Sequence, residues 1–382
     1  MARVRYLRRL DQVEQLTANE QAELKPVSDQ FAFRANDYYL SLIDWNNPDD
    51  PIRKIIIPHP DELYAFGDMD ASREKNNCVV PGCQHEYPHT VLLMCNEICG
   101  GYCRFCFRKR LFMDNGEEVV NDLTAALDYI RDNKQITNVL LTGGDPLLLS
   151  TRRLEKIIGT LREFDHVRIL RLGTKMTAFN PHRILDDPEL PRMLARFNQK
   201  DRKIYVMNHF NVPGELTDKA IAALDMLIRA GVIMVNQTPI LRGINDNAAT
   251  LAELMRKLSF VGVPAYYFFQ CRPTAGNKPF VVPLVSTYHL FEEAKKQVSG
   301  LAKRARLVMS HQQGKMEIVG INDETIFLRY HRARYPGDEG RLMAFKRNDQ
   351  AFWLEDLVPI RLAPRHDPRP GDSYSLPTGA DG

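Results

Sequence analysis

Short apolar runs and amphipathic stretches alternate along most of this chain. The runs at 90–95 and 203–208 (TVLLMC and KIYVMN) predict strands, whereas 154–161 and 219–228 repeat apolar residues at helical spacing. Strand and helix follow each other about six times, at intervals of roughly 30 residues. This alternation predicts an α/β fold with a parallel sheet wound by helices, and it leaves open whether the sheet closes into a barrel.

Four regions differ in their pattern. Residues 1–85 predict an N-terminal helical extension, in which prolines and carboxylates interrupt the apolar residues. Residues 86–300 hold the alternating core, and residues 301–362 form a C-terminal segment with β-like alternation. The last stretch, residues 363–382, is rich in Pro, Gly and Asp, and we expect a disordered tail there.

The composition is that of an ordinary globular enzyme: 44% of the 382 residues are hydrophobic, 26% are charged and the formal net charge is +3. This nearly balanced charge disfavours nucleic acid as a partner. No apolar stretch approaches the roughly 18 residues that span a bilayer, and the basic N-terminus lacks the apolar region of a secretory signal. Seven cysteines without an export signal favour a reducing compartment, so we expect a cytoplasmic protein.

Three cysteines in one short run carry the strongest chemical signal. Cys99, Cys103 and Cys106 follow the spacing C-x3-C-x2-C. Three thiolates on one loop can bind three irons of a 4Fe-4S cluster and leave the fourth iron open, unlike four-cysteine ferredoxin sites. An open iron can chelate S-adenosylmethionine, and the pattern is typical of the radical SAM superfamily. A zinc site is the alternative, but zinc usually has a fourth ligand nearby.

At 78–85, two cysteines and a histidine flank a Pro-Gly turn, which favours packing cysteines over a second metal site.

Other candidate residues lie after the cysteines or at predicted strand ends. Arg108 begins a basic run that forms either a solvated face or a carboxylate-binding fork, and its position favours function. In the turn Gly143-Gly144-Asp145, the glycines allow close backbone approach and the aspartate can accept an ammonium group.

His209, Gln237 and Cys271 also follow strand candidates. Because the carboxyl ends of parallel strands gather at one end of a barrel, these residues and the cysteine run are expected around a single site. Lys315 lies late in the chain, in a Gly-Lys pair. An isolated lysine is usually solvated, and a nucleophilic role needs an amine kept neutral by burial or by charged neighbours.

Together these motifs resemble the lysine 2,3-aminomutase family of radical SAM enzymes. The resemblance extends over about residues 30–330 and rests on CGGYCRFCFRKR, GGDPL, RLGTK, HFNVPGELT, NQTPILRGIND and YYLSLIDWNNPDDPIRK. It implies a partial (β/α)6 barrel, a 4Fe-4S cluster on the three cysteines, and S-adenosylmethionine with its amino group near Asp145. Gly143, Gly144, His209 and Gln237 are further candidates for binding a cofactor. The resemblance further implies pyridoxal phosphate on Lys315 with Tyr87 against its ring. Arg108 would then take the substrate α-carboxylate.

Two departures from the family concern the substrate pocket. The family's glycine-rich segment before the lysine is reduced to Gly314-Lys315, preceded here by Ser310-His311-Gln312-Gln313. Lysine-specific members carry one Asp shortly before this segment and another where this chain has Arg272. A buried ammonium group needs a partner of opposite charge, so free lysine is expected to fit poorly. Arg272 favours a substrate with an acidic or neutral distal group.

A third departure concerns the phosphate of the cofactor. The family's His-Arg-Tyr-Pro-Asp-Arg stretch reads His-Glu-Tyr-Pro-His-Thr at 85–90, so both arginines are lost. Glu86 would repel a phosphate, while Tyr87 is retained. The sequence therefore leaves pyridoxal phosphate itself open.

The resemblance implies an isomerase that generates a 5′-deoxyadenosyl radical, abstracts hydrogen from an amino-acid-like substrate and moves its amino group between carbons 2 and 3. One alternative is a rearrangement, elimination or dehydrogenation of a carboxylated small molecule without pyridoxal phosphate. Another is radical modification of a protein or RNA. The expected partners are a small-molecule substrate and an electron donor such as flavodoxin or ferredoxin, with no membrane and no nucleic acid. Homo-oligomerisation stays open.

Overall fold

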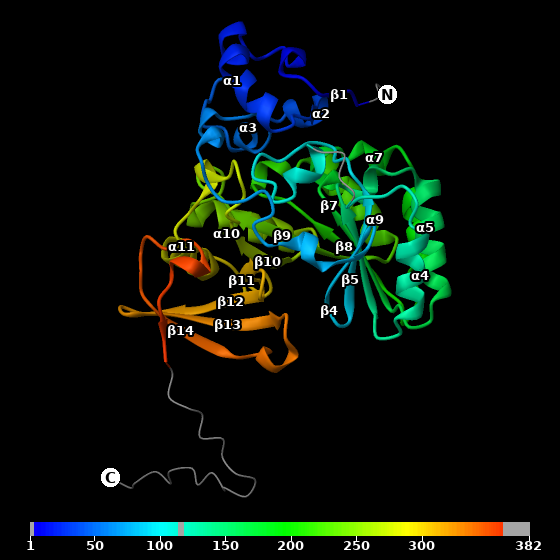
Figure 1. The fold of residues 1–382 in the computed structure, drawn as a ribbon. Helices are drawn as coiled ribbons and strands as arrows, with labels where there is room; N and C mark the ends of the chain where they lie inside the picture. Colours follow the sequence, from blue (N-terminus) through cyan, green and yellow to red (C-terminus); the bar gives the residue numbers. More distant parts are fainter. Residues whose placement is uncertain (1–3, 114–117, 362–382) are drawn as a thin grey trace, which may run out of the picture.

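The computed structural model describes residues 4–113 and 118–361 (Figure 1). The tail expected at 363–382 lies outside the described residues. Within the described parts of the chain, no helix is both long and apolar enough to cross a membrane.

The N-terminal region is mostly helical, as expected. Its helices are α1 (Ala18–Gln30), α2 (Asp37–Leu40) and α3 (Pro51–Ile56), with a small antiparallel pair of strands, β1 (Tyr6–Leu7) and β2 (Ala35–Asn36). Helix α1 begins with a capping box, in which Thr17 and Glu20 each accept a backbone N–H of the other. In Figure 1 this region, drawn in blue, lies over one end of the main sheet.

The same region ends in two strands that the sequence pattern did not predict. β3 (Cys78–Val80) and β4 (Cys83–Tyr87) form a hairpin, and β4 pairs antiparallel with the first strand of the core. The expectation of helices and loops throughout residues 1–85 is therefore wrong at its end. The polar run CQHEY lacks strand-like alternation, and it is extended because its backbone groups pair with the neighbouring strand.

Seven parallel strands form the centre of the sheet and follow one another in chain order. They are β5 (Thr90–Asn96), β6 (Asn138–Gly143), β7 (Ile169–Thr174), β8 (Ile204–Asn208), β9 (Ile233–Ile240), β10 (Ala265–Gln270) and β11 (Arg306–His311). Beyond β11 the sheet continues antiparallel with β12 (Gly314–Ile321), β13 (Thr325–Ala333), β14 (Leu342–Lys346) and β15 (Pro359–Ile360). The outermost parallel strands, β5 and β11, pair with antiparallel neighbours and not with each other, so the barrel is partial.

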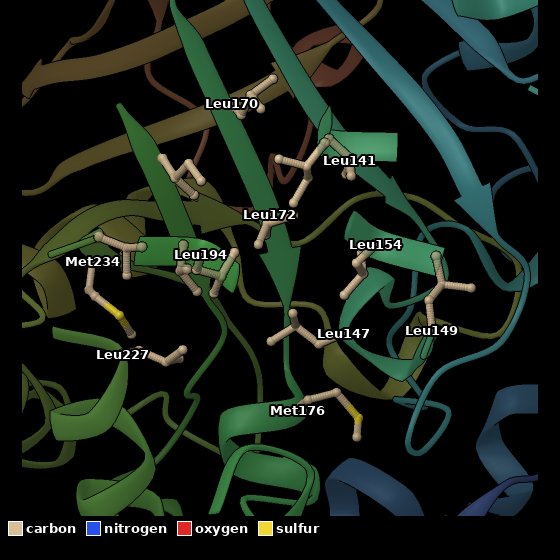
Figure 2. Close-up of a cluster of buried hydrophobic side chains, with 14 of the residues drawn as sticks. Leu141, Leu147, Leu149, Leu154, Leu170, Leu172, Met176, Leu194, Leu227 and Met234 are labelled. Atoms are coloured by element: carbon tan, nitrogen blue, oxygen red, sulfur yellow. The ribbon is translucent and has the colours of Figure 1, made fainter. Parts of the chain in front are cut away.

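Helices cover the outer face of the parallel strands. They are α4 (Thr124–Asp132), α5 (Thr151–Glu163), α6 (Met176–Phe179), α7 (His182–Leu185), α8 (Glu189–Phe197), α9 (Asp218–Arg229), α10 (Ala248–Phe260) and α11 (Leu284–Lys296). On β7, Leu170 and Leu172 point into this outer core, where Leu154 and Leu194 also lie (Figure 2). Because side chains alternate along a strand, Arg171 between them points to the interior of the partial barrel.

The two flanks of the sheet curve toward each other and enclose that interior. Arg332 on β13 donates to Oγ1 of Thr90 on β5 at 3.4 Å. Ser72, which precedes β3, donates to the carbonyl oxygen of Ser310 on β11 at 3.1 Å. These contacts bring residues far apart in the chain to one enclosed space.

Candidate active site

The cysteine run forms a loop after β5 that the N-terminal region holds in place. Arg34 Nε donates to the carbonyl oxygen of Cys99 at 2.8 Å, and Asn36 Nδ2 donates to that of Gly100 at 2.9 Å. The backbone N–H of Arg104 donates to Ile55 O at 2.9 Å. The loop carrying the thiols is therefore anchored by backbone contacts along its length.

The residues of this loop fit a cluster with one thiolate per iron. All three thiols are partly exposed, and burial raises the pKa of each, that of Cys103 to about 12. Deprotonation therefore needs a bound metal to stabilise the thiolates. Among residues 4–113 and 118–361, no three Cys, His, Asp or Glu side chains are grouped to hold a single metal ion. A cubane cluster needs each sulfur at a different iron, so the three thiolates need not converge on one metal ion.

One further ion pair anchors the cysteine loop and was missed in the sequence. Arg104, next to Cys103, forms hydrogen bonds through Nε and Nη2 with the carboxylate of Glu62 at 2.8–3.1 Å. Both side chains are almost fully buried, with 2% and 0% exposed. A buried bidentate pair of this kind fixes an orientation, because removing either partner leaves an isolated charge. Glu62 lies 42 residues earlier in the chain, and no local pattern connects it with the cysteines.

The basic run after the cysteines is buried, so its interpretation as a solvated face is wrong. Lys109 Nζ donates to the carbonyl oxygen of Arg104 at 2.8 Å and lies 4.6 Å from the centre of the Phe31 ring. Arg110 forms a bidentate pair with Glu118 at 2.9 Å. Arg108 points toward Thr142, donating through Nη1 to its Oγ1 at 3.0 Å.

Glu74 joins three arginines at the centre of the site. Its carboxylate accepts from Arg108 at 2.9 and 3.2 Å, from Arg110 at 3.2 Å and from Arg272 at 3.4 Å. These guanidinium groups hold the pKa of Glu74 well below its usual range, despite burial that acts in the opposite direction. Sequence reasoning missed Glu74, which lies in a short 3-10 helix with no recognisable motif. The structure thus brings the two predicted substrate residues, Arg108 and Arg272, to one carboxylate.

The Gly-Gly-Asp turn at the end of β6 packs against the start of the cysteine loop. A Cβ atom on Gly144 would lie 2.5–2.7 Å from backbone atoms of Ile98. Gly143 has φ +111°, and a Cβ atom on it would clash with the carbonyl oxygen of Asn96. The Asp145 N–H donates to Ile98 O at 2.9 Å. The close approach that requires the glycines is therefore to the protein's own backbone.

Asp145 is buried and already accepts several hydrogen bonds. Its donors are Thr174 Oγ1 at 2.8 Å, the Lys175 N–H at 2.7 Å and the Leu147 N–H at 3.0 Å. Burial raises its pKa to about 6 in spite of these donors. In this arrangement Asp145 links the turn after β6 to the residues at the end of β7. An ammonium group bound here would share the Asp145 carboxylate with these donors, which already reach both of its oxygens.

Two of the three residues predicted at strand ends lie there. His209 follows β8, and its ring packs edge-on against Phe105 of the cysteine loop, with centroids 5.8 Å apart. Burial and the charge of Lys175 lower the pKa of His209 well below its usual value. Cys271 follows β10 and is buried. Gln237 lies within β9, level with Tyr267 of β10, so its expected position after a strand is wrong.

Lys315 lies on β12, and its amine is placed among charged groups. Nζ donates to Ser310 Oγ at 3.0 Å, and Ser310 also accepts from Arg272 at 3.1 Å. Burial and the positive charge of Arg272 lower the pKa of Lys315 to about 8. An amine that loses its proton near neutral pH is suited to forming an imine with an aldehyde cofactor. Glu86 is a further charged neighbour, and burial raises the pKa of its carboxyl group.

The open iron-binding loop, the strand-end turn and the partial barrel define a radical SAM enzyme. The family model of the Radical SAM superfamily matches residues 95–255. The chain is 52% identical over 359 residues to a protein of Aquifex aeolicus named "Putative L-lysine 2,3-aminomutase", covering 94% of this chain and 96% of that protein.

Two other relatives carry names of related enzymes. The L-lysine 2,3-aminomutase of Clostridium subterminale is 38% identical, over 75% of this chain and 68% of its own length. The glutamate 2,3-aminomutase of Clostridioides difficile is 33% identical, over 77% of this chain and 68% of its own. The chain belongs to the lysine 2,3-aminomutase family and is an enzyme of the isomerase class. This family membership implies a 4Fe-4S cluster and S-adenosylmethionine.

Proposed function

We propose that the protein is a 2,3-aminomutase that acts on an amino acid other than free lysine and uses pyridoxal phosphate bound to Lys315. The single observation that carries this proposal is the position of the Lys315 amine. It has a lowered pKa and lies in the same enclosed cluster as Arg272, which shares Ser310 with it and Glu74 with Arg108. A nucleophilic amine beside two arginines can hold an amino-acid substrate at both its nitrogen and its carboxylate.

When bound, the cluster and S-adenosylmethionine supply the 5′-deoxyadenosyl radical, and pyridoxal phosphate holds the migrating nitrogen. The chain's own residues position these groups. Cys99, Cys103 and Cys106 would hold the iron. The site also needs one electron from outside, for which a flavodoxin or a ferredoxin in the cytoplasm is suited.

Arg108 is the proposed carboxylate ligand of the substrate. Its guanidinium faces Glu74 with two donors and Thr142 with a third. A substrate carboxylate would compete with Glu74 for this fork, because a guanidinium group binds either anion bidentately. Arg110 and Arg272 would retain Glu74 while Arg108 changes partner.

Arg272 supports the exclusion of lysine. A distal ammonium group reaching this part of the site would meet a guanidinium group, and the carboxylate bound to it, Glu74, already binds three arginines. A buried ammonium group without its own counter-ion is strongly disfavoured. A distal carboxylate or a neutral side chain would avoid this repulsion.

The test begins with anaerobically reconstituted protein supplied with pyridoxal phosphate and reduced with borohydride. Peptide mass spectrometry should find a pyridoxyl group on Lys315, and the absence of this adduct would leave the alternative of radical chemistry without pyridoxal phosphate. Cys103→Ala should abolish 5′-deoxyadenosine formation, whereas Cys78→Ala, at an exposed thiol, should retain it. A screen of free amino acids should then give β-amino products from acidic or neutral substrates. Rapid formation of β-lysine would contradict the proposed specificity.

A further inference from the structure

Two arginines from distant strands meet in the interior of the partial barrel. Arg332 on β13 has its guanidinium carbon 4.0 Å from the centre of the Tyr87 ring and donates to Thr90 Oγ1 at 3.4 Å. Arg171 on β7 donates through Nε to Asn138 Oδ1 at 2.8 Å. Thr90 and Asn138 are direct partners in the parallel pairing of β5 with β6, so the two arginines bind neighbouring side chains. Burial and the charge of Arg332 lower the pKa of Arg171 to about 10, as expected for neighbouring like charges.

Neither guanidinium group has an acidic partner. Across residues 4–113 and 118–361, Arg171 and Arg332 form no ion pair with a carboxylate, and their hydrogen bonds go to an amide and a hydroxyl oxygen. By contrast, Arg108, Arg110 and Arg272 all bind Glu74. Two enclosed like charges without a counter-ion are unfavourable by themselves, and a bound anion would relieve their repulsion.

The two carboxylates of this interior, Glu74 and Glu86, both face other cations. The charged neighbours of Glu86 that favour its ionised form are Lys315 and Arg272. Glu74 binds Arg108, Arg110 and Arg272. Glu86 also lies beside Tyr87, and burial raises the pKa of its carboxyl group, which lessens its repulsion of a phosphate. Arg332 lies over the same Tyr87 ring and reaches Thr90. Residues 85–90 contain no arginine, and the arginines near them come from β7 and β13.

Arg332 is also placed correctly relative to Lys315. The two residues are direct partners in the antiparallel pairing of β12 with β13. Directly paired residues have Cα atoms about 4.5–5.5 Å apart and side chains on the same face. In pyridoxal phosphate the aldehyde and the phosphate-bearing arm are attached to adjacent ring carbons. An amine and an anion site supplied by two directly paired residues therefore suit this molecule.

We infer that Arg332 and Arg171, with the hydroxyl of Thr90, bind the phosphate group of the cofactor that Lys315 anchors. This assignment rests on the proposed function. A phosphate monoester carries about −1.5 to −2 charge at neutral pH, which two guanidinium groups neutralise. Their forked donors match its oxygens, and the Tyr87 ring holds the guanidinium group of Arg332 in place.

The experiment compares pyridoxal phosphate with pyridoxal, which has the aldehyde but no phosphate. Each is titrated into wild type, Arg332→Gln and Arg171→Gln, and occupancy is measured as pyridoxyl-Lys315 after borohydride reduction. Wild type should prefer pyridoxal phosphate, and each variant should bind it about 10- to 100-fold more weakly, as expected for a lost charge-assisted hydrogen bond. Binding of pyridoxal should change much less.

Arg329→Gln is the matched control, because Arg329 lies on the same strand and is paired with Glu317. It should leave both affinities near wild type. Iron content and 5′-deoxyadenosine formation show whether each variant is folded. If Arg332→Gln does not fold, Arg171→Gln tests the phosphate site independently. If wild type carries the adduct and both folded variants keep its full preference for the phosphate, the phosphate site is wrong while the proposed function stands. If wild type carries no adduct on Lys315, both fail.

Discussion

Arg108 donates through Nε and Nη2 to the two carboxylate oxygens of Glu74, at 2.9 and 3.2 Å. The same carboxylate accepts from Arg110 and Arg272, so one glutamate keeps three guanidinium groups together beside the cysteine loop. The site thus contains an internal anion where the substrate carboxylate is expected. Arg108 is held in place by Glu74 and Thr142.

Neutralising Glu74 should destabilise the protein. Glu74→Gln leaves the arginines without their shared counter-ion, and we expect a loss of about 2–4 kcal/mol, since Glu74 is largely but not fully buried. Urea denaturation at neutral pH measures this change. Glu189→Gln, which breaks an exposed pair with Arg192, should cost at most about 0.5 kcal/mol.

The effect of Glu74 should also depend on pH. Its pKa is lower in the folded protein, so its contribution is complete above the unfolded-state pKa of about 4.3 and is lost progressively as the pH falls further. Acidification below this point should therefore reduce the stability of wild type more than that of Glu74→Gln, and the two should converge. Equal stabilities at neutral pH would show that Glu74 is not the counter-ion of this cluster.

Gly144→Ala should disrupt the contact between the Gly-Gly-Asp turn and the cysteine loop. The added methyl group would lie 2.5–2.7 Å from the Ile98 backbone, which cannot move aside as a flexible side chain would. Overpacking of this kind costs about 1–3 kcal/mol or more, and we expect reduced iron incorporation as well. Gly320→Ala on β12 is the control, because no atom lies within 4 Å of its added Cβ. Full iron content in Gly144→Ala would contradict this role of the turn.

The reactivity of Lys315 should have its midpoint near pH 8. Only the neutral amine attacks an aldehyde, and burial together with Arg272 lowers the pKa of Lys315 to about 8. The rate of adduct formation with pyridoxal phosphate, followed by borohydride trapping, should rise through this pH. Arg272→Gln should move the midpoint upward and Arg272→Lys should leave it nearly unchanged.

The same shift affects stability in a defined direction. Between about pH 8 and about 10.4 the unfolded chain binds more protons at this lysine than the folded protein does, so the contribution of Lys315 to the free energy of unfolding increases with pH. A midpoint for adduct formation near 10.4 in wild type would show that the amine is not perturbed.

Much of the fold followed from local patterns. The runs at 90–95 and 203–208 became β5 and β8 because parallel strands buried on both faces need continuous apolar stretches. The short hairpin β3–β4 was not predicted, since its polar residues are extended only through pairing with β5. Likewise, the position of Gln237 within β9 depends on where the strand ends, which apolar pattern locates poorly.

The sequence by itself determined the cysteine loop and the family, because both depend on residues close together in the chain. Only the tertiary structure decided the charge partners: Glu62 with Arg104, Glu74 with three arginines, and Arg332 opposite Lys315. Glu62 lies 42 residues before Arg104 in the chain, and Glu74 lies 34 residues before Arg108. An ion pair needs proximity in space and imposes no spacing in sequence, so local pattern could name the charged residues but could not pair them.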